Sequence, residues 1–316
     1  MKRAILFLLF ATTLSAPLHA AVECSVQGAP VLDFGTVDPF TGGAVTSQVT
    51  LNWSCSRGWF ESQQNTICIH LANDSSNNQL PRYLDAISGQ PPAIPFNVYT
   101  SPAHATVIGQ PGTTTNAGMG INVDMPWFTF NTSGTVTLYG QLPRPLPATT
   151  RAETHQTLMT GSQVRVRTGG LNQSCNSGAG ATTGTYTLTA RATIPDQCQV
   201  SATDLDFGTR NTPLTQADSE STVSVRCSNS TDFLVGLSNG SHGQRNLSNG
   251  SYLVSYELYR DAGRSLRWGN SAGERQSGTG QGPGTGLSFT VFGRVFADAN
   301  AEVGSYRDTV TVEVTF

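Results

Sequence analysis

Apolar and polar residues alternate along much of the chain with a period of two, which predicts β-strands rather than helices. The alternation is clearest in segments 186–194 and 310–316, whose apolar members are Tyr186, Leu188, Ala190, Ala192 and Ile194, and Val310, Val312, Val314 and Phe316. The 33 glycines, the 16 prolines and turn pairs such as Asn239–Gly240 are typical of many short strands joined by loops. We therefore predict an all-β protein.

The second half of the chain repeats a block of the first half. Cys24, the run Leu32-Asp33-Phe34-Gly35-Thr36 and Cys55 recur as Cys198, Leu205-Asp206-Phe207-Gly208-Thr209 and Cys227. Further matches follow in order: 82–84 with 245–247, 96–99 with 256–259, Gly109 with Gly269, 136–140 with 289–293, and 184–186 with 304–306. The repeat predicts two tandem immunoglobulin-like β-sandwich domains, residues 21–194 and 195–316, with a boundary near Pro195.

Residues 1–20 have the pattern of a secretory signal peptide. Lys2 and Arg3 precede an apolar run from Ala4 to Ala11, and small residues follow near Ala16 to Ala20. The apolar run is too short to span a bilayer. We therefore expect export of the mature chain, and cleavage after Ala20 leaves residues 21–23 before Cys24.

Composition and spacing argue against most enzyme classes. Only 12% of residues are charged and the single lysine is Lys2, which excludes a Schiff-base or phosphate-loop lysine and gives no basic stripe for nucleic acid. The histidines are scattered and no cysteine pair has CxxC spacing, so we expect no metal site and no cofactor. Residues Gly236–Gly240 match the G-x-S-x-G pattern of a nucleophile elbow, but no helix is expected after them. The alternating glycines at 278–286 lack the strand-to-helix transition that a phosphate-binding loop needs. Asp204 and Asp206 flank Leu205 on one side, and we assign them structural roles.

Six cysteines in an exported chain favour disulfides over metal binding. The repeat makes Cys24–Cys55 equivalent to Cys198–Cys227. Cys68 and Cys175 remain as a third candidate pair, within the first domain.

The repeated block, the aromatic strand ending in Leu258-Tyr259 and above all the closing run from Gly304 to Phe316 resemble the spore coat protein U domain family. That family includes secreted subunits of archaic chaperone-usher pili. A two-domain chain of this kind is similar to the tip adhesin subunit of Csu-type pili, and the resemblance covers both halves.

The resemblance implies that a family pilin domain lacks its last strand, which the donor strand of the next subunit supplies by strand addition. Before assembly, a periplasmic chaperone would hold the open edge, and an outer-membrane usher would receive the subunit. The implied groove residues are Tyr306, Val310, Val312, Val314 and Phe316. Three residues before Cys24 are too few for a donor strand of about 5–6 residues. We therefore expect a subunit that only accepts a strand, outside the cell at the pilus tip.

The first copy is longer than the second, and several of its extra loops are apolar. If these loops lie exposed together, they form a patch that attaches to an abiotic or host surface and supports biofilm formation. The residues of this predicted patch are Trp59, Phe60, Ile87, Ile94, Met119, Ile121, Val123, Met125, Trp127 and Phe128. Burial of the same residues is the opposing possibility, and it would favour a non-adhesive structural or assembly-initiating minor pilin.

Two further hypotheses concern the first domain. A glycan-binding tip lectin would need a polar pocket, which the sequence does not reveal. Residues 164–167, Val-Arg-Val-Arg, are a candidate for the strand that closes the first sandwich internally.

Overall fold

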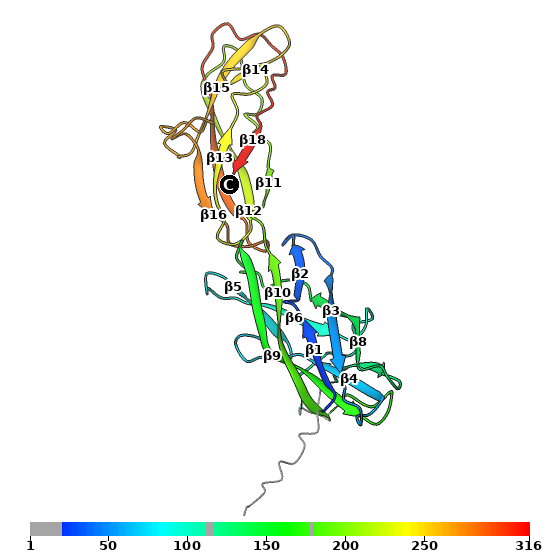
Figure 1. The fold of residues 1–316 in the computed structure, drawn as a ribbon. Helices are drawn as coiled ribbons and strands as arrows, with labels where there is room; N and C mark the ends of the chain where they lie inside the picture. Colours follow the sequence, from blue (N-terminus) through cyan, green and yellow to red (C-terminus); the bar gives the residue numbers. More distant parts are fainter. Residues whose placement is uncertain (1–20, 112–116, 177–179) are drawn as a thin grey trace, which may run out of the picture.

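The computed structural model describes residues 21–111, 117–176 and 180–316. The predicted signal peptide, residues 1–20, lies outside this part of the chain. The described residues contain strands and loops without a helix, so none of them forms a helix that could cross a membrane. The prediction of an all-β chain of two immunoglobulin-like domains is confirmed (Figure 1).

Ten strands form the first domain. They are β1 (Glu23–Gln27), β2 (Val31–Thr36), β3 (Val45–Ser56), β4 (Gln64–His70), β5 (Arg82–Ala86), β6 (Ile94–Tyr99), β7 (Met119–Asp124), β8 (Asn131–Leu142), β9 (Thr154–Thr168) and β10 (Ala181–Thr193). The strand order is β1-β3-β8-β6-β5-β9-β10-β2, and β4 pairs with both β7 and β9. Strands β9 and β10 form a long antiparallel pair, whereas β10 and β2 run parallel.

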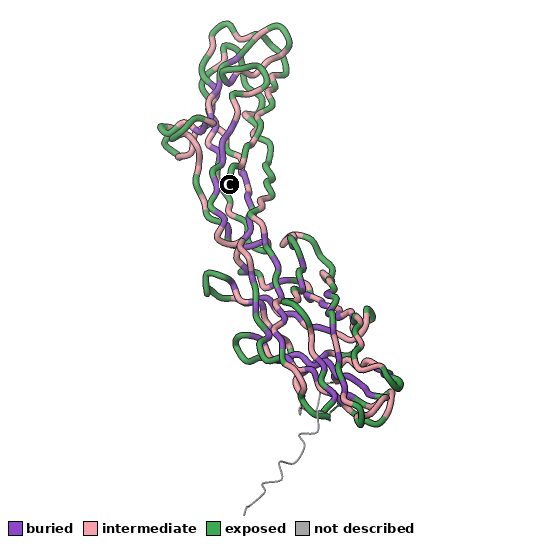
Figure 2. The backbone as a smooth tube through the Cα atoms, viewed as in Figure 1, coloured by how far each residue is buried: buried purple, intermediate pink, exposed green. Residues whose placement is uncertain are grey.

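The second domain has eight strands in two sheets. They are β11 (Cys198–Ala202), β12 (Ala217–Cys227), β13 (Asp232–Leu237), β14 (Asn246–Ser248), β15 (Leu253–Tyr259), β16 (Gln276–Thr279), β17 (Leu287–Val295) and β18 (Val312–Thr315). One sheet has the order β11-β12-β17-β15-β14 and the other β16-β13-β18. Buried residues alternate with more exposed ones along most strands of both domains (Figure 2), and the buried apolar residues form two separate cores.

Equivalent hydrogen bonds occur at matching positions inside each of the two domains. Arg82 is fully buried, and its guanidinium donates to three backbone carbonyls, among them Leu71 O (3.2 Å). Arg245 is buried in the second domain and donates to Leu237 O (3.1 Å). Leu71 N and Leu237 N each lie 3.1 Å from the carbonyl oxygen of an equivalent glycine. The repeat read from the sequence therefore corresponds to a structural repeat.

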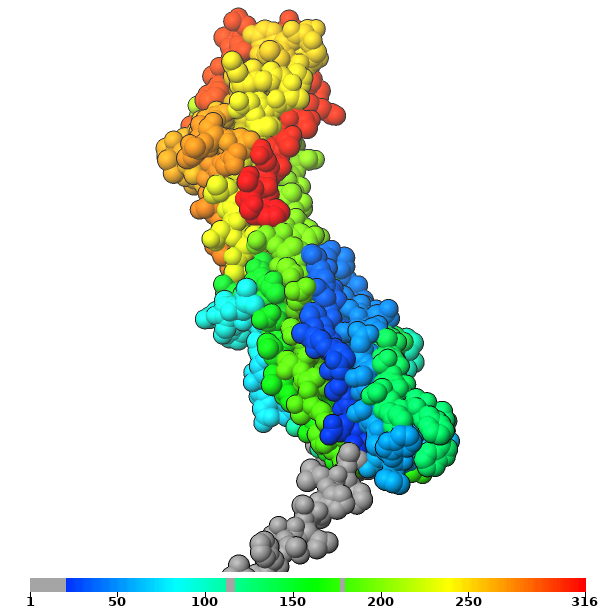
Figure 3. Space-filling model, in the orientation of Figure 1, coloured from blue at the N-terminus to red at the C-terminus, as the bar shows by residue number. Residues whose placement is uncertain are grey.

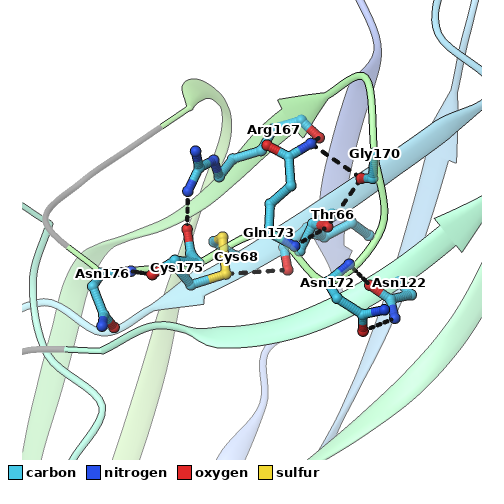
Figure 4. Close-up of a disulfide and its surroundings, with 11 residues drawn as sticks. Thr66, Cys68, Asn122, Arg167, Gly170, Asn172, Gln173, Cys175 and Asn176 are labelled. Carbon is cyan, nitrogen blue, oxygen red and sulfur yellow. Dashed lines mark hydrogen bonds between the residues drawn. A yellow bond between two sulfur atoms is a disulfide. The ribbon is translucent and has the colours of Figure 1, made fainter.

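All three predicted disulfides are present: Cys24–Cys55, Cys68–Cys175 and Cys198–Cys227. Cys68–Cys175 attaches the connection between β9 and β10 to β4 (Figure 4). Asn122 of β7 holds the same connection, because its side chain accepts from Asn172 N (2.7 Å) and donates to Asn172 Oδ1 (2.6 Å). The long β9–β10 connection is thereby fixed to the body of the sheet.

The first domain is closed by its own chain, but not by the segment expected from the sequence. Residues 163–168 of β9 pair with β4 in the way that β18 pairs with β13 in the second domain. The additional strand is β10, which pairs with β9 on one side and β2 on the other. The hypothesis for residues 164–167 was therefore wrong about the strand, and so was the match of 184–186 with 304–306. Apolar and polar residues alternate in both β9 and β10, and this alternation does not show which neighbours a strand has in the sheet.

The two domains lie end to end (Figures 1 and 3). Near the junction, Ala152 N donates to Asn229 O (3.0 Å), and the Asn229 side chain donates to Thr149 O (2.6 Å). The loop 147–153 of the first domain thus contacts the loop after β12 of the second. The opposite pole of the first domain is the end at which β3 finishes and β8 begins.

Candidate functional site

Four exposed aromatic side chains gather on two loops at the pole of the first domain remote from the second domain. Trp59 and Phe60 follow β3, and Trp127 and Phe128 precede β8; their exposed fractions are 56%, 97%, 62% and 78%. The Trp59 ring lies 6.1 Å from the Phe128 ring in an edge-to-face arrangement. Both loop segments lie at the lower end of the molecule in Figure 3. We call these four residues the aromatic tip.

A buried arginine holds the two loops of the aromatic tip together. Arg57 Nε donates to Thr129 O (3.0 Å), and its Nη2 donates to Pro126 O (2.9 Å). Its backbone N–H donates to Phe130 O (2.9 Å), and its guanidinium lies 5.4 Å from the centre of the Phe130 ring. One side chain therefore fixes the 126–130 loop against the end of β3.

The backbone at the aromatic tip is strained at one position. Phe128 has a φ of 71°, in the left-handed region that a bulky residue rarely adopts. The hydrogen bond from Thr129 N to Pro126 O (2.9 Å) closes the turn around it. The turn points the Phe128 ring outward, where 78% of the residue is exposed.

The other residues of the predicted apolar patch lie elsewhere, and this part of the prediction was wrong. Ile94, Val123 and Met125 are buried in the core, because they occupy inward positions of β6, of β7 and just after β7. Met119 and Ile121 are half-buried and pack against the same core. These residues follow the period-two alternation of their strands, so their apolar character reflects packing.

Ile87 is 63% exposed but lies near the other pole of the domain. Its backbone N–H donates to Thr154 O (3.1 Å), close to the junction with the second domain. The structure therefore separates it from the aromatic tip. Arg57 and Phe130 were not among the predicted site residues. The signals that the sequence offers for them are an arginine two residues before Trp59 and an aromatic residue two residues after Phe128.

The second candidate site is an open sheet edge in the second domain. In the first domain Leu32 and Phe34 of β2 are buried beside β10. Their counterparts Leu205 and Phe207 are only half-buried, and residues 204–209 form no strand. The structure describes no strand of the second domain in the position of β10. The edge between 204–209 and β18 therefore leaves part of the second core uncovered.

The predicted groove residues lie along this edge. Tyr306, Val310, Val312 and Val314 are half-buried against the second core, and Phe316 is 58% exposed. This exposure is what an acceptor groove requires, while the binding of a strand there stays a prediction.

The closing motif is anchored by the Asp308 carboxylate. It accepts hydrogen bonds from the Tyr256 hydroxyl (2.6 Å), the Ser241 hydroxyl (2.8 Å) and Thr309 N (2.8 Å). Burial raises the pKa of Asp308, but these hydrogen bonds outweigh burial and hold the pKa below its usual value. Asp308 is therefore an ionised anchor that positions the start of β18 on the second core.

A shallow polar depression of about 470 Å³ lies on the sheet next to the aromatic tip. Hydroxyl and amide side chains from the adjoining ends of β1, β3 and β8 dominate its lining, among them Ser25, Ser54, Ser56, Asn131 and Ser133. Such groups can form hydrogen bonds with a hydroxylated ligand.

The sequence motifs that suggested catalysis have structural roles. The Ser238 hydroxyl in the Gly236–Gly240 run accepts from Thr311 N (2.9 Å) and so ties a loop to β18. A Cβ on Gly278 would come within 2.5 Å of the Phe233 ring, so this glycine allows close packing. Within the described residues, no group of three or more histidine, cysteine, aspartate or glutamate side chains is placed to hold a metal ion.

Comparison with known proteins places the fold in a family. Residues 10–161 and 184–313 match the family model described as the Spore Coat Protein U domain. The chain belongs to the spore coat protein U domain family. The curated relative Protein U of Myxococcus xanthus is 40% identical over 75 residues, which are 23% of this chain and 38% of the relative. The chain thus matches well under half of that relative's length.

A solved structure shares the spore coat U architecture of this chain. The match is a chain of the CsuC–CsuE chaperone–tip adhesion subunit pre-assembly complex from archaic chaperone-usher Csu pili of Acinetobacter baumannii. The superposition has a TM-score of 0.50 and covers 93% of this chain and 100% of that chain, at 17% sequence identity. This likeness shows a common fold.

Proposed function

We propose that this chain is the tip subunit of a chaperone-usher type pilus and that the aromatic tip attaches the fibre to apolar surfaces. Family membership and the shared fold support a pilus subunit. The observation that carries the adhesive role is the exposure of four aromatic side chains, on braced loops, at the pole opposite the strand-accepting domain.

The energetics suit attachment to an uncharged surface. Burial of a large apolar side chain contributes about 1.5–3 kcal/mol. Arg57 holds the loops in place before contact, so little conformational entropy is lost when the rings are buried. Many fibres on one cell add their contacts, which multiplies a modest affinity. The target in this proposal is an abiotic or host surface with apolar patches.

The open edge of the second domain supplies the link to the fibre. An uncovered sheet edge promotes aggregation, so a periplasmic chaperone strand would cover it until the usher exchanges that strand for the donor strand of the next subunit. The first domain uses its own β10 and needs no partner. Export by the predicted signal peptide and a position at the distal end of the fibre complete this proposal.

The test is attachment to plastic by cells whose pili carry Trp59→Ser, Phe60→Ser, Trp127→Ser and Phe128→Ser together. We expect normal fibre numbers and at least tenfold weaker attachment. Ile87→Ser is the matched control, because it removes an equally exposed apolar side chain far from the aromatic tip. Full attachment by normal pili of the fourfold variant would refute adhesion through these rings and favour a non-adhesive minor pilin.

A glycan-binding tip is the second candidate, favoured by the polar depression beside the aromatic tip. The replacements Ser56→Ala and Asn131→Ala remove two of its polar groups. If soluble glycans block attachment and these replacements abolish it, the lectin function replaces the hydrophobic one.

A further inference from the structure

The first domain shows how a closing strand is recognised at this sheet edge. Strand β10 lies parallel to β2, with Ala190 opposite Leu32 and Arg191 opposite Asp33. Arg191 donates to Asp33 Oδ2 from Nε (2.9 Å) and forms an ion pair through Nη2 (2.7 Å). Asp33 Oδ1 accepts from Gly35 N (2.8 Å). The hydrogen bond from Gly35 and the nearby guanidinium lower the pKa of Asp33, so the carboxylate is ionised.

The second domain repeats this arrangement without the arginine. Asp206 Oδ1 accepts from Gly208 N (2.7 Å), and the Asp206 carbonyl accepts from Ser219, as that of Asp33 does from Ser47. The Asp206 side chain is exposed and has no ion-pair partner among the described residues. Its second carboxylate oxygen is therefore available at an edge where a strand is absent.

A second acid strengthens the charge of this edge. Asp204 lies two residues before Asp206, where the first domain has Val31. Residues two apart in an extended segment point to the same face, so both carboxylates border the position of the absent strand. Residues 204–209 thus carry two carboxylates where residues 31–36 carry one. Arg210, the cation that follows this segment, donates to Phe207 O (2.7 Å) and forms no ion pair with either carboxylate among the described residues.

We propose that this acidic edge selects a partner strand that carries an arginine or lysine beside Asp206. The partner is an extended segment of another chain, parallel to residues 204–209 and antiparallel to β18. Its alternate apolar side chains cover the second core, and the residue opposite Leu205 is small, as Ala190 is opposite Leu32. This inference rests on the proposed strand-accepting function and adds the register and charge of the strand.

A single basic residue in the partner strand can fix how that strand aligns with residues 204–209. Side chains of a strand alternate between faces, so a slip of one residue would move the cation from the exposed Asp206 towards the apolar core. An acidic residue in the same place would face two carboxylates. An exposed ion pair changes an equilibrium by about two- to fivefold, which is enough to favour one register over its neighbours.

The test adds a strand to the full chain. After Phe316, a glycine-serine linker leads to a copy of residues 185–194, in three versions with arginine, alanine or glutamate at the place corresponding to Arg191. Hydrogen exchange of β13 and β15 amides measures opening of the second domain. We expect the arginine version to open about two- to fivefold less than the alanine version, and the glutamate version to open more than either.

Substitutions of Asp206 identify the partner of the cation. In Asp206→Asn, the arginine version should protect the second domain no better than the alanine version. In Asp206→Arg, an added strand with aspartate at this place should protect the second domain better than the alanine version. Asp124→Asn, which removes an exposed acid of the first domain, should leave the advantage unchanged.

The outcomes separate the inference from the function on which it rests. If none of the added strands protects the second domain, the strand-accepting function itself is refuted. Equal protection by all three versions would leave that function intact and overturn the charge selection. An advantage of arginine that persists in Asp206→Asn would overturn the assignment of Asp206.

Discussion

Replacement of Arg57 by methionine should loosen the aromatic tip without unfolding the first domain. Methionine keeps an apolar stem of similar length but cannot donate to the carbonyls of Thr129, Pro126 and Gly58, which lie 2.9–3.2 Å from the guanidinium. All three acceptors belong to the loops of the aromatic tip rather than to strands of the sheet. The loss should therefore be confined to these loops.

The magnitude follows from the contacts of Arg57. A hydrogen bond from a charged donor contributes about 1.5–3 kcal/mol when both groups stay buried. Loop carbonyls regain water when the loops open, so we expect a total loss of about 2–4 kcal/mol for the three bonds and the contact with Phe130. This corresponds to roughly 30- to 1,000-fold more frequent opening of the loops.

Hydrogen exchange of residues 57–61 and 126–130 measures this opening, and attachment to plastic measures its consequence. We expect fast exchange in the loops, unchanged exchange in β8 and β9, and attachment reduced at least fivefold. Arg191→Met is the matched control, because it removes an exposed arginine whose ion pair contributes about 0–1 kcal/mol. Unchanged loop exchange in Arg57→Met would refute the bracing role, and loose loops with full attachment would show that adhesion does not need them fixed.

Three further predictions concern stability. Burial lowers the pKa of His70 from 6.5, so below about pH 6.5 the unfolded chain binds a proton that the folded chain does not. The free energy of unfolding of the first domain should therefore fall as the pH drops below about 6.5, by up to about 1.4 kcal/mol per pH unit. Urea titrations of His70→Phe should show a flatter pH dependence, and an equal slope would contradict this origin. Asp308→Asn should destabilise the second domain by about 1–3 kcal/mol and speed exchange in β18, with the first domain unaffected. The double variant Cys68→Ala/Cys175→Ala opens a cross-link between residues 107 apart and should lower the urea stability of the first domain by up to about 4–5 kcal/mol, while an effect on the second domain alone would be inconsistent with its place.

The class of fold and much of the internal symmetry could be predicted from the sequence because they depend on local pattern. Alternation at 310–316 reflects a strand with one face on a core, and the structure places Val312 and Val314 against that core. The matching of Cys24–Cys55 with Cys198–Cys227 was also sound, since a repeated block implies repeated pairing. Arg82 and Arg245 matched in the alignment and have the same buried role.

The exposed part of the candidate site was predictable only in part. Trp59 and Phe128 lie in loops, and loop residues need not point to a core. Val123 and Met125 belong to the same apolar run of sequence as Phe128, but Val123 lies on the inner face of β7, and Met125, which follows β7, is buried in the core. Which side of a strand faces the core depends on pairing with β4, and such long-range register is absent from local pattern.

The place of β10 was the larger error, and it is also the feature with most bearing on function. Both β9 and β10 alternate, so the sequence could not decide which of them corresponds to β18. The pairing does decide it, because β9 contacts β4 as β18 contacts β13. The disulfide at Cys175 and the hydrogen bonds of Asn172 hold the connection that returns the chain as β10.

The additional strand β10 distinguishes the first domain from the second at the sheet edge beside β2. With β10 in place, Leu32 and Phe34 are buried and the first domain has a complete core without another chain. Without such a strand, Leu205 and Phe207 stay half-buried and the second domain presents an edge that another chain can complete. In the proposed pilus, the first domain needs no partner strand, and the exposed rings of the aromatic tip lie at its pole remote from the second domain. In the proposed pilus, the presence of β10 in the first domain and its absence from the second would therefore assign attachment to one domain and assembly to the other.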